Sequence, residues 1–215
     1  MNDNTPLRKR LEKFWQPPNF ISFFEKNTKR AAHVIKKRTV LFNEGDPLER
    51  LFCIKEGFVK LYRLSLEGRE TTVYLFGPGN VLGLRSNTSK DGTAKHNAEA
   101  LTDVTVLTMS RAEYFDALSK HPEFVVDLSH MFMQRLNYTE KRLAGFIVAN
   151  TTSRIADFFL DTAKRFGKTK NGKIILPLKL SHQRIAEFVG ALRETVTISL
   201  QKLEKEKIIK NEKGE

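Results

Sequence analysis

Cysteine is nearly absent from this sequence. Its 215 residues include one, Cys53, which lies in the apolar run at residues 51–54. A single cysteine excludes an internal disulfide, and it cannot supply the cysteine cluster of an iron–sulfur centre or of a structural zinc site. We therefore expect Cys53 to be a buried, unreactive thiol.

Long hydrophobic runs are absent too. No uninterrupted apolar stretch approaches the roughly 20 residues of a membrane-spanning helix, and the charged N-terminus lacks the apolar segment of a signal peptide. We therefore predict a soluble protein with no membrane partner, located in the cytoplasm.

The histidines do not form a metal-binding pattern. A metal-dependent enzyme on a β-barrel, such as a cupin, needs clustered histidines and a carboxylate. The five histidines are scattered and include no H-x-H pair: His33, His96, His121, His130 and His182. We predict no metal, no cofactor and no catalytic residues. A cupin-like metalloenzyme is a distant alternative, and a haem ligated by His96 or Cys53 is another.

Positive charge is concentrated at both ends of the chain. Residues 1–40 hold ten Lys and Arg against three Asp and Glu, residues 41–150 hold 13 against 14, and residues 151–215 hold 14 against eight. A general need for surface solubility would spread the charge more evenly. A basic module beside a neutral one is instead typical of a DNA-binding head attached to a sensory body.

The stretch at residues 181–203 has the pattern of a helix-turn-helix motif. Ser181 is suited to cap a first helix, and Gly190 is suited to end it in the left-handed conformation. A second helix is predicted from Arg193, with an apolar stripe at spacings of four and three. The first residues of such a second helix meet base edges in the major groove, where Arg can pair with guanine and Glu with cytosine. We predict that seven residues face DNA: Ser181, His182, Gln183, Arg193, Glu194, Thr195 and Thr197.

The string I-A-E-F-V-G-A-L-R-E-T-V-T at residues 185–197 resembles the recognition motif of the CRP/FNR superfamily of bacterial transcription regulators. The preceding L-K-L-S-H-Q-R is especially similar to the cyanobacterial global nitrogen regulators. The chain departs from the family at Ile198, where a second arginine usually stands. The resemblance implies a nitrogen-responsive activator, with a plastid stroma as the alternative location, and RNA polymerase as a partner.

Residues 31–110 have the pattern of a β domain. Short strand-like runs alternate with turn signals such as G-D-P at residues 45–47 and G-P-G-N at residues 77–80. This spacing predicts a sandwich or jelly roll. The order of the motifs also resembles the cyclic-nucleotide-binding fold of the same superfamily. The runs are at residues 39–42, 51–55, 58–64, 70–76, 96–100 and 104–109.

A long helix is expected after His121-Pro122. Its apolar residues recur at spacings near 3.5, which is the seam that two parallel helices need in order to pair. The predicted seam consists of Val125, Leu128, Phe132, Thr139, Leu143 and Phe146. In the resembled family this helix is the dimer interface, and a DNA site with two half-sites also requires a dimer. We predict a homodimer on double-stranded DNA with a pseudo-palindromic operator.

The whole chain is therefore predicted to be α+β. Residues 1–120 should form a lead-in and a β jelly roll of the cyclic-nucleotide-binding type. The lead-in should pack through Phe20, Ile21, Phe23 and Phe24. A dimerisation helix is expected over 121–149. A winged helix-turn-helix domain follows over 150–215. In it we expect a helix at 152–166, a polar loop at 167–172 and a strand pair at 173–180. A wing should begin at Ile208-Ile209 and be truncated at residue 215.

The resemblance also implies where an effector would bind. Relatives that bind cAMP carry a glycine-glutamate pair and an arginine-serine pair, and neither is found at residues 81–85 or 92–97, so cAMP is disfavoured. The nitrogen regulators bind 2-oxoglutarate through a glycine segment matched by Leu82, Gly83 and Leu84, and through a helix pair matched by Arg135 and Glu140. An arginine of their β domain is Ala94 here, with Lys95 or Arg85 as substitutes.

Five residues of helix separate Arg135 from Glu140, so their side chains lie roughly 140° apart. One can face its own pocket while the other reaches a partner helix. The alternative is an interhelical salt bridge that only fixes the dimer, which would leave a regulator with another effector or with none. A module that binds effector but not DNA, because of the short wing, is a further alternative.

Overall fold

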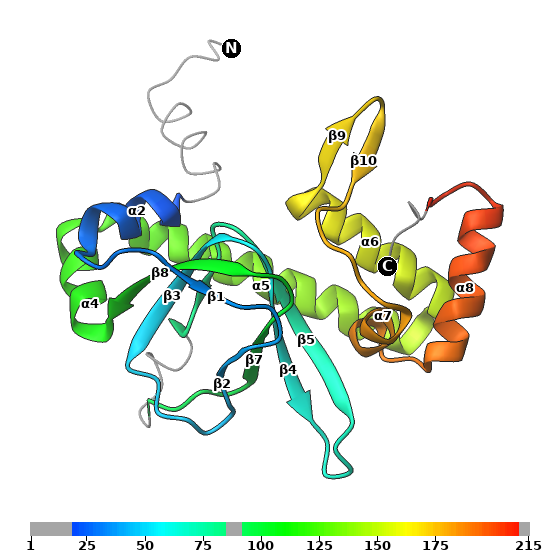
Figure 1. Ribbon diagram of the computed structural model, residues 1–215, viewed down its shortest axis with the longest axis horizontal. Coiled ribbons are helices and arrows are strands. Elements are labelled where there is room, and N and C mark those ends of the chain that lie inside the picture. The colour runs from blue at the N-terminus through cyan, green and yellow to red at the C-terminus, as the bar shows by residue number, and fades with distance from the viewer. Residues whose placement is uncertain (1–18, 85–91, 211–215) are drawn as a thin grey trace, which may run out of the picture.

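The computed structural model describes residues 19–84 and 92–210. A roll of β-strands lies at one end of the molecule, a long helix runs beneath it, and a group of helices with a small hairpin forms the other end (Figure 1). Three predictions fall outside these described residues: the first half of the lead-in (residues 1–18), Arg85 as a substitute cation, and the truncated wing (residues 211–215).

The β-roll consists of two four-stranded antiparallel sheets. One has the strand order β1-β8-β3-β6 and the other has the order β2-β7-β4-β5. The strands are β1 (His33–Ile35), β2 (Val40–Phe42), β3 (Arg50–Glu56), β4 (Val59–Leu64), β5 (Glu70–Phe76), β6 (Val81–Leu82), β7 (Asn97–Ala100) and β8 (Val104–Ser110). All six predicted runs are strands. The prediction missed β1 and β6, which are the short edge strands of the first sheet and too brief for an alternating pattern.

Alternation along the strands builds the core between the sheets. Val59 and Ala98 from the second sheet meet Ile54 and Val106 from the first in one buried cluster. Cys53 points to the other side of β3, into the cluster beneath the helices, and is fully buried. Burial, and secondarily the charge of Glu25, raise the pKa of its thiol to about 12, so the prediction of a buried thiol is confirmed.

Helices cover the outer face of the first sheet. These are α2 (Phe20–Asn27), α4 (Arg111–Lys120) and the first turns of α5 (Glu123–Val148). The phenylalanines Phe20, Phe23 and Phe24 of α2 are buried there against Tyr114 and Met109, as predicted.

The long helix α5 has two rows of side chains that are rich in apolar residues. An inner row contacts the rest of the chain and consists of Leu128, Met131, Arg135, Tyr138 and Arg142. An outer row, which we call the outer seam, is exposed and consists of Val126, Ser129, Met133, Leu136, Glu140, Leu143 and Ile147. Both rows repeat at spacings of three and four. Of the predicted seam, only Leu143 belongs to the outer seam. Leu128 is buried under the β-roll, so the prediction was wrong for it, because the periodicity alone could not separate the two faces. The other four predicted residues are exposed and lie on α5 between the two rows: Val125, Phe132, Thr139 and Phe146.

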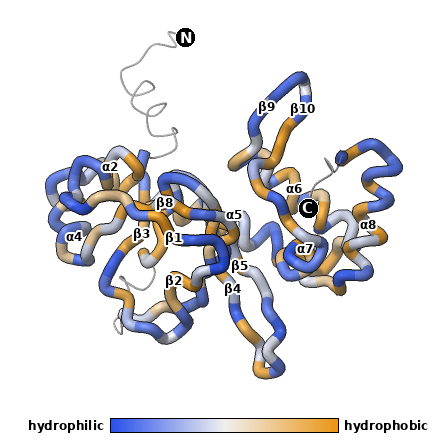
Figure 2. Tube along the Cα trace, in the orientation of Figure 1, coloured by the Kyte–Doolittle hydropathy of each residue, from blue (hydrophilic) through white to orange (hydrophobic). Residues whose placement is uncertain are grey.

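The C-terminal end comprises α6 (Thr151–Phe166), β9 (Lys168–Lys170), β10 (Lys173–Ile175), α7 (His182–Val189) and α8 (Arg193–Lys205). Strand β9 lies where a polar loop was predicted. Strand β10 lies at the start of the span predicted as a strand pair, and no second strand follows it within residues 176–180. Asn171 and Gly172 both have positive φ, which is the two-residue turn that favours hairpins. In Figure 2 β9 is largely hydrophilic while β10 is hydrophobic.

The strand predicted at Ile208-Ile209 is absent from the described part of the chain. Lys207 adopts a left-handed φ of 58°, and the amides of Ile208 and Ile209 turn back to the carbonyl of Leu203 at 3.0 and 3.5 Å. This arrangement ends α8 instead of starting a wing.

Gly57 lies in very close contact with a neighbouring segment of the chain and yields a stability prediction. Its φ is +85°, and an added Cβ would lie 2.2 Å from the carbonyl oxygen of Asp103. We expect Gly57→Ala to lower the free energy of unfolding by about 2–4 kcal/mol, through strain and overpacking. Gly68→Ala is the control, because its φ is +75° but nothing lies within 4 Å, so about 1 kcal/mol is expected. Urea unfolding followed by circular dichroism measures both, and equal losses would contradict the role of Asp103.

Candidate DNA-binding and effector sites

The helix-turn-helix forms as the sequence predicted. The Ser181 hydroxyl accepts from the Arg184 amide at 3.3 Å at the start of α7. Gly190 ends the helix in the left-handed conformation with φ 62° and ψ 53°. Leu192 then precedes α8 without a side-chain cap. The capping residue and the glycine together fix the angle at which the chain enters the second helix.

The predicted DNA-facing residues divide into two groups. Arg193, Glu194 and Thr195 are exposed at the start of α8. Neither Arg193 nor Glu194 forms an ion pair with another described residue. Thr197 is half-buried: its hydroxyl donates to the Arg193 carbonyl at 3.0 Å and lies 2.8 Å from Nδ1 of His182. The His182–Thr197 pair therefore also joins the two helices.

Gln183 is exposed on α7 and donates to Glu187 one turn later, at 3.2 Å. Together with Ser181, it lies at the N-terminal end of α7. Backbone amides at a helix start attract anions, so this end is suited to a DNA phosphate.

An ionic network, which the sequence analysis did not predict, joins α7 to the β-roll. Lys60 of β4 is fully buried and lies 2.5 Å from Glu70 of β5 and 2.9 Å from Glu99 of β7. Arg184 of α7 reaches Glu99 at 3.0 Å and Glu70 at 3.3 Å, and it also pairs with Glu187 at 3.1 Å. We call these five residues the docking network.

Two further arginines fasten the C-terminal helices to β5. Arg142 of α5 donates to the carbonyls of Val73 and Thr72 on β5, and to the Phe188 carbonyl of α7 at 2.6 Å. Arg165 of α6 donates to the Leu75 carbonyl. Because each guanidinium joins its own helix to another element, the position of α7 and α6 relative to β5 is set by directed bonds.

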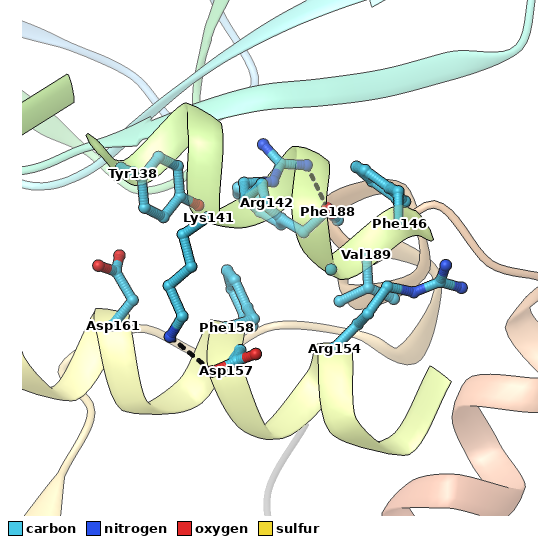
Figure 3. Close-up of a pocket in the computed structure, with 11 residues that line it drawn as sticks. Tyr138, Lys141, Arg142, Phe146, Arg154, Asp157, Phe158, Asp161, Phe188 and Val189 are labelled. Carbon is cyan, nitrogen blue, oxygen red and sulfur yellow. Dashed lines mark hydrogen bonds and ion pairs between the residues drawn. The ribbon is translucent and has the colours of Figure 1, made fainter. Parts of the chain in front are cut away.

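A small pocket opens beside these contacts, between α5, α6 and α7 (Figure 3). The ion pair between Lys141 and Asp157, at 2.6 Å, bridges α5 and α6 at its edge. Arg142 reaches the Phe188 carbonyl on the opposite side. The pocket thus lies where α7 of the helix-turn-helix packs against α5 and α6.

The predicted effector residues are partly brought together. Arg135 extends under the β-roll, donates to the Val81 carbonyl at 3.2 Å, and lies 4.7 Å from the Phe76 ring centroid. This carbonyl directly precedes the segment Leu82, Gly83 and Leu84, whose two leucines are buried. Burial lowers the pKa of Arg135 to about 10, so the guanidinium is still charged at neutral pH.

Glu140 does not join this group within the chain. It lies exposed on the outer seam, between Leu136 and Leu143, while Arg135 lies on the inner row. Ala94 is buried in the core, and Lys95 donates to Thr93 at 2.9 Å.

The residues that the sequence analysis missed are charged groups inside strands and helices. Lys60 and Tyr62 are two residues apart on β4 and therefore point to the same, outer face of the sheet. Both are buried, so this face is covered. A lysine within the apolar run V-K-L-Y was the available signal. The link to α7 could not be inferred, because Arg184 is 114 positions from Glu70.

Comparison with known proteins agrees with the fold and the motif. Residues 32–121 match the cyclic nucleotide-binding domain, and residues 153–215 match the Crp-like helix-turn-helix domain. The global nitrogen regulator of Nostoc sp. (strain PCC 7120) is 32% identical over 179 residues, covering 83% of this chain and 80% of that protein. A CRP-like cAMP-activated global transcriptional regulator of Mycobacterium tuberculosis (strain H37Rv) is 32% identical over 160 residues, covering 74% and 71%.

Solved structures show the same architecture. FixK2 from Bradyrhizobium japonicum superposes with a TM-score of 0.73 at 23% identity, covering 86% of this chain and 89% of that one. TTHA1359, a CRP/FNR family regulator from Thermus thermophilus, has a TM-score of 0.67 at 26% identity, covering 86% and 91%.

The β-roll, the long helix and the exposed helix-turn-helix, in this order, are the architecture of a DNA-binding transcription regulator. The chain belongs to the CRP/FNR family. Regulators of this family bind DNA and act as dimers.

No group of three histidine, cysteine or acidic side chains that could hold a metal is found in residues 19–84 and 92–210. Over the same described ranges, every helix is too short or too polar to cross a membrane.

The docking network predicts a stability effect for Arg184. In Arg184→Ala the carboxylates of Glu70 and Glu99 would share Lys60 as the one remaining cation of the network, and Glu187 would lose its ion pair. We expect the free energy of unfolding to fall by about 2–3 kcal/mol, less than for a fully buried pair because Arg184 is partly exposed. The control is Lys120→Ala, which removes an exposed pair with Asp116 and should cost about 0.5 kcal/mol or less. Urea unfolding compares them, and a loss at Arg184 no larger than the control would contradict the network.

Proposed function

We propose that this protein is a homodimeric, nitrogen-responsive activator that binds a pseudo-palindromic operator and senses 2-oxoglutarate. The observation that carries the effector proposal is the position of Arg135. Its guanidinium lies beneath the β-roll, beside the glycine segment, and contacts a backbone carbonyl and aromatic rings.

Electrostatics support an anionic effector at Arg135. Within the described ranges no carboxylate pairs with this arginine, and its neighbour Arg165 is also a cation. A partly buried guanidinium without an anion carries a desolvation penalty that a bound carboxylate would offset through paired, charge-assisted hydrogen bonds. A dicarboxylate such as 2-oxoglutarate fits this chemistry. The relatives' names are divided between nitrogen regulation and cAMP activation. We keep cAMP disfavoured because residues 81–85 have no glutamate after the glycine and residues 92–97 have no arginine-serine pair.

For DNA recognition we propose the exposed start of α8. Arg193, Glu194 and Thr195 would meet base edges, while Ser181, His182, Gln183 and Thr197 would position the two helices on the DNA backbone. Residues 151–215 hold 14 Lys and Arg against eight Asp and Glu, and this excess of positive charge suits the phosphates. We also propose RNA polymerase as a partner and the cytoplasm as the location, with a plastid stroma as the alternative.

For the dimer we propose the outer seam of α5. Its apolar residues are exposed in the single chain, although they recur at the spacing of a paired helix. Pairing two copies along this seam would bury them and would bring Glu140 towards the partner helix. Glu140 could then complete the effector site across the interface, or act only as a dimer contact.

Titration calorimetry of the purified protein with 2-oxoglutarate tests the effector. We expect binding by the wild type and no binding of cAMP. Arg135→Ala should weaken the affinity about 10- to 100-fold, because one charged hydrogen-bonding group is lost. Arg63→Ala, which removes an exposed pair with Glu44, is the control and should leave the affinity unchanged. If neither ligand binds while operator binding is intact, Arg135 and Glu140 serve only the structure.

Sedimentation velocity tests the dimer. Leu136→Glu would place one carboxylate per chain in the middle of the outer seam, next to Glu140, and we expect monomers at micromolar concentration. Leu160→Glu is the control: Leu160 is also exposed, but on α6, and its variant should stay dimeric. A dimer that survives Leu136→Glu would place the interface elsewhere.

A further inference from the structure

Ile198 is an exception among the large apolar residues of α8. The other three, Val196, Leu200 and Leu203, are buried against α6 and α7, whereas 68% of Ile198 is exposed. A β-branched residue is also a poor choice for an exposed helix position, since Ala or Lys would stabilise the helix better. Neither packing nor helix propensity explains this isoleucine.

The helical geometry places Ile198 on the side of α8 that faces away from the core. It lies four residues after Glu194 and three before Gln201, so these three side chains share one face. All three are exposed. Ile198 is therefore on the second turn of α8, directly after the exposed residues Arg193, Glu194 and Thr195.

The surroundings of Ile198 argue against a protein-docking surface. Its neighbours along the exposed face are polar or charged, namely Glu194, Gln201 and Lys202. Leu192, the other exposed large apolar residue near it, directly precedes the helix. Six residues separate it from Ile198, which rotates the two side chains about 240° from each other around the helix axis, so they do not form a continuous patch. A lone apolar side chain within a polar face matches a partner that is polar except for isolated methyl groups.

The major groove of DNA is such a partner. Base edges there present hydrogen-bond donors and acceptors, and the C5 methyl of thymine is their apolar group. We propose that Ile198 makes an apolar contact with a thymine methyl group in each half-site, and so specifies an A·T pair. This inference rests on the proposed use of α8 for base recognition, and it assigns a base preference to a position where the family usually has arginine.

Removing the methyl group from DNA tests the contact. An operator is first selected from a random palindromic library with the wild-type protein. Each thymine of a half-site is then replaced by uracil, which keeps the base pair and removes only the methyl. Burying one such group changes affinity by about fourfold, so we expect one thymine at which uracil weakens wild-type binding about fourfold, or about fifteenfold when both half-sites are changed.

The same titrations are repeated with Ile198→Ala and with a matched control. Ile198→Ala should bind the thymine operator more weakly and should lose the difference between thymine and uracil; alanine favours helix, so the variant should fold. Ile174→Ala removes an isoleucine of similar exposure, 62%, on the hairpin β9–β10, and should keep the full difference.

The outcomes separate this contact from the proposed function. An operator that is bound equally well with uracil at every position overturns the contact but leaves sequence-specific binding intact. A difference between thymine and uracil that persists in Ile198→Ala also overturns it. Failure to select any operator would overturn both proposals together.

Discussion

The arrangement of this molecule depends on a lysine that has no access to water. The amine of Lys60 lies in the outer face of a sheet, under α7, where an unpaired charge would be strongly unfavourable. Glu70 and Glu99 neutralise it, and their excess negative charge is in turn met by Arg184. The first helix of the helix-turn-helix thus supplies part of the charge balance of the β-roll. Removing α7 from the sheet would expose or unpair these groups at the same time.

The inner row of α5 holds α7 as well, beside the docking network. Arg135 contacts the strand end at Val81, and two turns later Arg142 bonds to both β5 and the carbonyl of Phe188 on α7. A shift of α5 against β5 at the proposed effector site would therefore strain the bonds that hold α7. A rigid helix that contacts both places gives a physical route for coupling, because an effector can favour one arrangement by its differential affinity.

Local signals were sufficient for some elements and not for others. The helix-turn-helix followed from a capping serine, a glycine and an apolar stripe, all within 23 residues of sequence. Strand β9 was mispredicted as a loop although Asn171-Gly172 carries a local turn signal, so that error was avoidable. The two faces of α5 could not be separated, because both are apolar at the same spacing. The docking network was out of reach, since its members come from β4, β5, β7 and α7 and meet only in the fold.

The ionic character of the domain contact also affects how the molecule can change shape. The apolar attraction within the shared cluster of Phe58, Leu75 and Phe188 is not directional, so it does not by itself fix one register. Paired charges and bonds to single carbonyls do, because each is satisfied in one register only. Intermediate positions of α7 would leave Arg184, Glu70 and Glu99 partly unpaired in a largely buried region. The contact should therefore be either fully made or fully broken, which favours two discrete placements of the recognition helix over a continuous range.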